Sequence, residues 1–174
     1  MSEPRILVVY GYHNDEQFSS RVARILESRT LPGVSVTEYR GERIPRDVDL
    51  RSIPLRRFLR TQPGADYVID LHDSARARDY MLREGSRYPA ISFSMLAKRN
   101  LPRALTVDLD GYLRMQEEVF GRQILRSYVD GWRDASSKYD LIWVDYFSHY
   151  TSINRSSEFL TGLVATLSRH PRRA

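Results

Sequence analysis

The amino-acid sequence predicts a single α/β domain with a mixed, mostly parallel sheet flanked by helices. Two observations lead to this fold class. Apolar runs of strand length alternate with stretches of helical periodicity, which is the order expected of α/β proteins. The 174 residues also contain no repeat, linker or low-complexity segment, and this length suits one domain. The domain is therefore expected to span residues 1–174.

Six segments are predicted to be strands because they gather apolar, β-branched or aromatic residues in short runs bounded by turn residues. The predicted strands cover residues 5–12, 34–39, 65–72, 89–95, 103–109 and 140–147. The first of them reads RILVVYGY and is apolar almost throughout, as is typical of a parallel strand that is covered on both faces.

Helices are predicted where apolar residues recur every three or four positions. The predicted helices cover residues 16–29, 112–132 and 156–169, with a shorter one near 55–61. In the first helix the buried side is expected to carry Phe18, Val22, Ile25 and Leu26. Residues 40–54 are polar, rich in arginine and without a period, so they are predicted to be an ordered loop or a binding segment.

The composition excludes several kinds of chemistry. The chain has no cysteine, which removes disulfides, thiolate nucleophiles and every zinc site built on cysteine. It contains no phosphate-binding glycine loop and no GxSxG turn. No apolar run approaches the ~20 residues of a membrane span, and the N-terminus shows no signal peptide. A cytoplasmic protein without a membrane partner is expected.

The charge pattern disfavours nucleic-acid binding but does not exclude it. The net charge is +5, and all of the 27 basic residues except Lys98 and Lys138 are arginine. These arginines are spread along the chain, and the only dense group is the C-terminal tail, RHPRRA. No predicted helix carries a basic face interleaved with aromatic residues, which is the pattern expected of a nucleic-acid-binding helix.

Two polar motifs stand at the ends of predicted strands. His13-Asn14-Asp15-Glu16 follows the first strand, and Asp70-Leu71-His72 closes the third. In open α/β sheets the functional crevice lies beyond the carboxyl ends of the strands. If Glu16 begins the next helix, its side chain can turn back to meet His13 and His72. Two histidines and one glutamate leave a fourth position open, as catalytic zinc requires, and they suit zinc better than magnesium or calcium.

Each of these residues also has a purely structural interpretation. His13 could be a turn histidine that bonds to the backbone, and Glu16 could be favoured by the positive end of the helix. Asp70 lies on the same strand face as His72, so it is predicted to support the site or to form an ion pair. Other polar residues near the motifs and along the chain are interpreted as cap, turn, surface or tail residues: Asp15, Asp73, His149 and His170.

The motifs resemble a known family of metal enzymes. The sequence GYHNDE is similar to the Gly-x-His-Gly-x-Glu element of the aspartoacylase and succinylglutamate desuccinylase family, which belongs with the zinc carboxypeptidases. VIDLHDS resembles the Asp-Leu-His element of that family. RALTVDLDGY and the long helix after it resemble the block Ala-Ile-Thr-Val-Glu-Leu-Gly, and RDVDLRSIP is similar to Asp-Leu-Asn-Arg-x-Phe-Pro. The resemblance runs from about Arg5 to about Trp132.

The resemblance implies a zinc carboxypeptidase-like fold and a set of site residues. It implies that His13, Glu16 and His72 bind zinc, and that Arg51 pairs with a carboxylate of the substrate. Asp108 stands where the family has a catalytic glutamate, which activates the attacking water and protonates the leaving amine. The chain departs from the family pattern in that this carboxylate is one methylene shorter and Leu50, not asparagine, precedes the arginine.

The implied function is a zinc-dependent amide hydrolase that acts on an N-acyl amino acid or on a C-terminal peptide bond. Its partner would be a small anionic substrate. Two alternatives stay open. The first is a non-catalytic descendant of the same fold that binds a metal or an acidic ligand, which Asp108 and the short interval between the motifs favour. The second is an arginine-rich nucleic-acid-binding module. The sequence leaves open the oligomeric state, the substrate and the choice between zinc and nickel, cobalt or iron(II) at such a site.

Overall fold

The structure is a computed structural model that describes residues 3–13, 15–40, 57–62, 64–73, 82–83, 87–94 and 139–169. The strand predicted at 103–109 and the helix predicted at 112–132 lie outside these residues. So do Arg51 and Asp108, the residues predicted to bind substrate and to act as the base.

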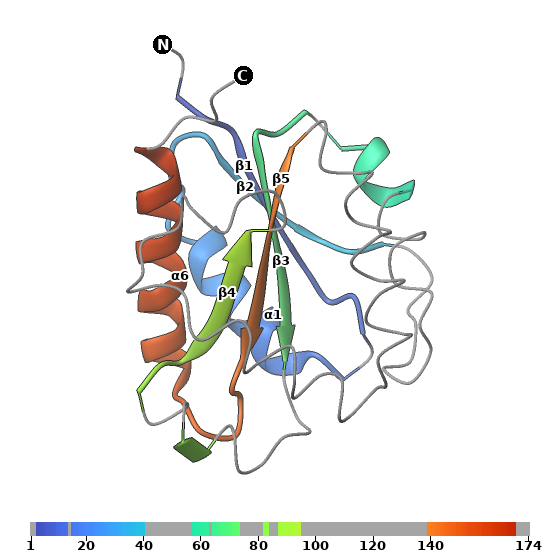
Figure 1. Ribbon diagram of the computed structural model, residues 1–174. Coiled ribbons are helices and arrows are strands. Elements are labelled where there is room, and N and C mark those ends of the chain that lie inside the picture. The colour runs from blue at the N-terminus through green and yellow to red at the C-terminus, as the bar shows by residue number, and fades with distance from the viewer. Residues whose placement is uncertain are drawn as a thin grey trace.

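The described strands form one sheet (Figure 1), and their order in it is β2-β1-β3-β5-β4. Strands β1 (Ile6–Tyr10), β2 (Val34–Glu38), β3 (Tyr67–Asp73) and β5 (Asp140–Tyr146) run parallel, and β4 (Ala90–Ser94) pairs antiparallel with β5. The predicted α/β class with a mixed, mostly parallel sheet is thereby confirmed.

The register brings the strands that precede or contain the two predicted metal-binding motifs, β1 and β3, side by side. Ile6 of β1 pairs with Tyr67 of β3, which pairs in turn with Asp140 of β5. Pairing between β1 and β3 ends at Val9 and Asp70, whereas β3 continues beside β5 as far as Asp73. The last residues of β3 therefore extend past the end of β1, into the space where the loop after β1 turns.

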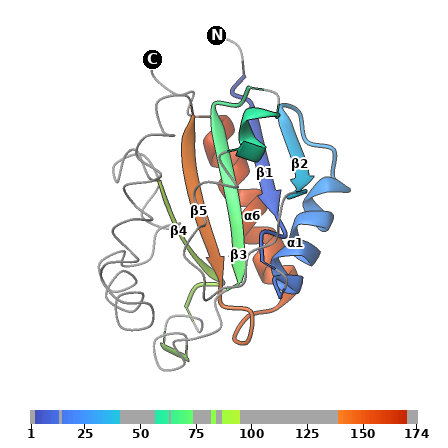
Figure 2. The ribbon, with the colours of Figure 1, turned by 90° about the vertical axis from the view of Figure 1, so that its right-hand side faces the viewer.

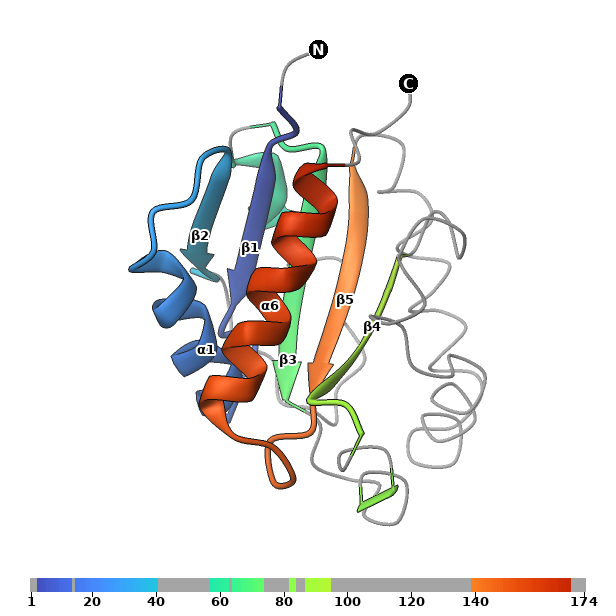
Figure 3. The same cartoon turned by 90° about the vertical axis from the view of Figure 1, so that its left-hand side faces the viewer.

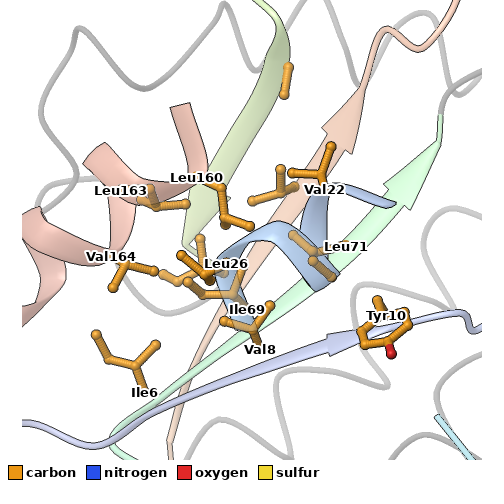
Figure 4. Packing of buried hydrophobic residues seen from close by; sticks show 14 of the residues in the cluster. Ile6, Val8, Tyr10, Val22, Leu26, Ile69, Leu71, Leu160, Leu163 and Val164 are labelled. Atoms are coloured by element: carbon orange, nitrogen blue, oxygen red, sulfur yellow. The ribbon is translucent and has the colours of Figure 1, made fainter. Parts of the chain in front are cut away.

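One face of the sheet is covered by two helices, α1 (Gln17–Glu27) and α6 (Ile153–Ser168) (Figure 3). Their apolar side chains pack on alternate residues of β1, β3 and β5 (Figure 4). Burial of a Val, Leu or Ile side chain contributes about 1.5–3 kcal/mol, so this layer supplies most of the described core. Its labelled members are Ile6, Val8, Tyr10, Val22, Leu26, Ile69, Leu71, Leu160, Leu163 and Val164.

The opposite face of the sheet carries a second, smaller apolar cluster. It combines Val9, Val68 and Trp143 with Leu59, which belongs to a short helical turn at residues 57–60 on the side away from α6 (Figure 2). Because side chains alternate along a strand, Asp70 and His72 share this face with Val68. The predicted metal ligand on β3 thus lies on the face that α1 and α6 leave uncovered.

The predicted boundaries agree with the described elements except at α6. This helix begins at Ile153 rather than near residue 156 because the hydroxyl of Ser152 caps it, accepting a hydrogen bond from the N–H of Arg155 at 3.2 Å. Within the described part of the chain, neither helix combines the length and the apolar character that crossing a membrane requires.

Candidate metal centre

The chain turns sharply after β1, at the carboxyl ends of the parallel strands. Gly11 has a φ of +76°, which glycine adopts at little cost because it has no Cβ. Tyr12 and His13 follow, both almost fully buried, and Glu16 stands at the N-cap position of α1. The prediction that Glu16 begins the helix and turns back toward the strand is confirmed.

Three potential ligand side chains converge at these strand ends. His13, Glu16 and His72 are only 2–4% exposed, and one ligand atom of each lies within 4.8 Å of the others. Nδ1 of His72 lies 2.8 Å from Oε1 of Glu16, and Nε2 of His13 lies 3.9 Å from the same oxygen. Tetrahedral zinc separates such atoms by about 3.4 Å, a value between the two distances. The group can therefore hold a metal ion.

The ring of His72 is held on both of its nitrogens and on one face. Nε2 lies 2.8 Å from Oδ2 of Asp70, and the ring stacks on Trp143 with centroids 4.0 Å apart and an interplanar angle of 17°. A carboxylate on the far nitrogen of a ligand histidine fixes the orientation of its ring and raises its basicity. The predicted supporting role of Asp70 thus has a direct structural basis.

The remaining oxygen of Glu16 is also engaged. Its Oε2 accepts a hydrogen bond from the backbone N–H of His13 at 2.9 Å. The two ligands from the first motif are therefore fixed relative to each other, while Oε1 faces His72.

The charges at the centre shift two pKa values in opposite directions. Burial by itself lowers the pKa of His72, but the negative charges of Asp70 and Glu16 outweigh it and raise that pKa to about 10. Burial by itself raises the pKa of Glu16, but the positive charge of His72 and its hydrogen bond outweigh it, and the net shift is downward.

Asp73 follows the ligand His72 and contacts α1 instead of the centre. Its Oδ2 and Oδ1 accept hydrogen bonds from the backbone N–H groups of Phe18 and Ser19, at 2.9 and 2.7 Å. Burial raises the pKa of Asp73 to about 6, even though the hydrogen bond from the Ser19 backbone opposes the shift. Asp73 was predicted to be a cap or turn residue, and these hydrogen bonds make it a cap, although the helix that it caps is distant in sequence.

One buried carboxylate near the centre was not predicted from the sequence. Asp145 of β5 is directly beside His72 in the register and is 4% exposed. In the sequence it is part of the apolar run of residues 140–147, which predicts only a core strand. A carboxylate near the carboxyl end of an apolar strand was the available signal, but only the order of the strands brings it next to a metal ligand.

The other two histidines of the chain are His149 and His170. His149 is exposed, in agreement with its predicted surface position, and His170 lies outside the described residues.

Comparison with known protein families, with curated proteins and with solved structures gives no match for this chain. The family resemblance therefore rests on the sequence motifs.

Proposed function

We propose that this protein is a zinc-dependent hydrolase that cleaves an amide bond, in an N-acyl amino acid or at the C-terminus of a peptide. The convergence of His13, Glu16 and His72 carries the proposal. His72 lies on β3, whereas His13 and Glu16 lie between β1 and α1, and the pairing of Glu16 with His72 spans 56 residues of sequence. Burying charged groups is costly unless they are paired or bind a metal.

The donor set favours zinc among the common metals. Zinc, a borderline metal ion, suits two imidazoles and one carboxylate better than magnesium or calcium does, and three protein ligands leave a position open for water or substrate. When bound, zinc would polarise a carbonyl group and lower the pKa of a water molecule to about 7. These are the two requirements for hydrolysing an amide near neutral pH.

The protein's own residues would hold the reactants and move the proton. Asp70 would orient His72, and Arg51 would bind an anionic substrate group through the paired N–H donors of its guanidinium. Asp108 would accept a proton from the attacking water and return it to the leaving amine. The register of β3 and β5 supports Asp145 as an alternative for that role, because it stands beside His72 on the same face of the sheet.

The first experiment measures metal per chain by elemental analysis after zinc is supplied. We expect close to one zinc per chain in the natural protein and none in His13→Ala or His72→Ala. The exposed His149→Ala is the control and should keep its zinc. A natural protein that takes up no zinc would overturn the proposal.

The second experiment tests turnover on a panel of N-acyl amino acids and short peptides. His72→Ala should abolish activity. Of Asp108→Asn and Asp145→Asn, the variant that keeps its zinc and loses turnover rate identifies the proton acceptor. Zinc without any turnover would favour the non-catalytic alternative. Nucleic-acid binding that falls steeply with salt and survives in His13→Ala and His72→Ala would favour the arginine-rich module.

A further inference from the structure

Asp73 forms a bridge between the two halves of the metal centre. It directly follows His72 on β3, and its carboxylate accepts the N–H groups of Phe18 and Ser19, the second and third residues of α1. Glu16 is the residue immediately before that helix. One buried carboxylate thus joins the strand that carries one ligand to the helix that follows another.

The start of α1 is unusual in how its N–H donors are satisfied. The first N–H groups of a helix have no partner within the helix, and the side chain at the N-cap normally accepts one of them. Here the N-cap is Glu16, which makes no capping hydrogen bond with its side chain. Both of its oxygens are directed to the centre instead, Oε1 to His72 and Oε2 to the N–H of His13.

We propose that Asp73 is a positioning residue for the metal centre, because it caps α1 in place of Glu16 and so keeps the Glu16 carboxylate directed toward His13 and His72. This inference rests on the proposed metal-dependent function. It gives the two carboxylates separate tasks. Asp73 satisfies the helix donors, and Glu16 is left to bind the ion.

Removal of the Asp73 carboxylate has a defined consequence under this proposal. The N–H groups of Phe18 and Ser19 lose their acceptor. Glu16 is then the nearest carboxylate along the chain that can accept these hydrogen bonds in place of Asp73. When Glu16 caps the helix it no longer faces His72, so capping competes with metal binding. The loss should therefore appear in metal affinity more than in folding.

The test compares zinc affinities, measured by competition with a chelator, for the natural protein, Asp73→Asn and Asp73→Ala. The control is Asp66→Asn at the opposite end of β3, where Asp66 accepts the backbone N–H of Arg5 at 2.8 Å. We expect Asp73→Ala to bind zinc about 10- to 100-fold more weakly. Asp73→Asn, which keeps one acceptor, should lose less, and Asp66→Asn should stay within about twofold of the natural protein.

The Co²⁺ absorption spectrum separates positioning from a simple loss of negative charge. If Glu16 leaves its place, the coordination geometry changes, and the d–d bands of the Co²⁺-loaded Asp73→Ala protein should shift in position and intensity. Loss of charge alone would weaken binding and leave these bands unchanged. Unchanged bands, or an affinity equal to that of Asp66→Asn, would overturn the proposal.

A double-mutant cycle of Asp73 and Glu16, measured by urea unfolding of the metal-free proteins, tests the role of Asp73 independently of zinc. Asp73→Ala should lower the unfolding midpoint more in a Glu16→Ala background than in the natural protein, because Glu16 is the nearest carboxylate along the chain that can replace the lost cap. Additive effects would overturn the positioning role. If Asp73→Ala does not fold, Asp73→Asn takes its place in the cycle. A natural protein that binds no zinc would overturn the proposed function alone, and the cycle would still test Asp73.

Discussion

At the scale of single residues, His72 is the centre of the site. Its ring is buried, bonded through both nitrogens to carboxylates and stacked on Trp143. Nδ1 lies 2.8 Å from the Glu16 carboxylate, whereas Nε2 lies 2.8 Å from the Asp70 carboxylate. Under the proposed function, Nδ1 would be the nitrogen that binds the ion, and Asp70 would fix the ring.

Replacement of Asp70 should weaken metal binding without changing its stoichiometry. Asp70→Asn removes the negative charge that orients the His72 ring, so we expect zinc affinity to fall about 10- to 100-fold, measured by chelator competition. At saturating zinc the variant should still hold one ion per chain. An affinity equal to that of the natural protein would show that Asp70 does not orient the ligand.

Zinc uptake should release a proton from His72. Because the pKa of His72 is raised to about 10, the charged ring stabilises the metal-free protein fully below its unfolded pKa of about 6.5, and this stabilisation is lost as the pH rises through about 10. Zinc requires the neutral ring, so its affinity should rise with pH across this window.

Calorimetric titration near pH 7 in buffers of different ionisation enthalpy measures this exchange. We expect about one proton released for each zinc bound, since the lowered pKa of Glu16 leaves that carboxylate already ionised. A binding enthalpy that is independent of the buffer would contradict the charged state of His72.

The site residues that could be predicted from sequence are those whose chemistry is visible in a short segment. His13, Glu16 and His72 stand next to apolar strands in a spacing that metal sites use, and alternation along β3 related Asp70 to His72. Asp145 could not be assigned, because its place depends on which strand neighbours β3.

At the scale of secondary-structure elements, the turns decide whether the ligands meet. Apolar runs predicted the strands well because buried parallel strands are apolar throughout. The start of α6 was predicted less well because it depends on a serine cap, which lies before the apolar pattern begins. The capping of α1 could not be predicted in detail, since its acceptor is 54 and 55 residues away in sequence.

Two glycine substitutions should shift stability in opposite directions. At Gly11, where φ is +76°, an alanine is strained and should cost about 1–2 kcal/mol of unfolding free energy. At Gly162, an exposed position inside α6 where a Cβ meets no atom within 4 Å, alanine should add about 0.5–1 kcal/mol. Urea unfolding of Gly11→Ala and Gly162→Ala measures both, and equal shifts would contradict the strained turn.

At the scale of the whole molecule, the strand order brings together what the sequence separates. β1 and β3 are neighbours although β2 lies between them in the chain, and β4 runs antiparallel beside β5 at the edge of the described sheet. Local patterns predict strands but not their neighbours, because pairing depends on contacts across the whole sheet. The fold class was therefore predictable, and the strand order was not.

Zinc should stabilise the folded protein as a whole, because the unfolded chain does not hold the three ligands together. Free zinc at 100 times its dissociation constant should add about 2.7 kcal/mol to the unfolding free energy, and a chelator should remove this gain. His72→Ala should show no zinc-dependent shift of the unfolding midpoint. An equal shift in that variant would mean that zinc binds elsewhere.

The stacking of Trp143 on His72 gives the centre an optical reporter. Trp143 is one of two tryptophans, so Trp132→Phe leaves its indole as the only one that emits. The His72 ring stacks on this indole with centroids 4.0 Å apart, and its raised pKa predicts a positive charge there that quenches the emission. Exchange of the ring proton for zinc should brighten the emission, whereas Co²⁺, with its partly filled d shell, should darken it. The occupancy of the site can then be followed in real time, before any substrate is known.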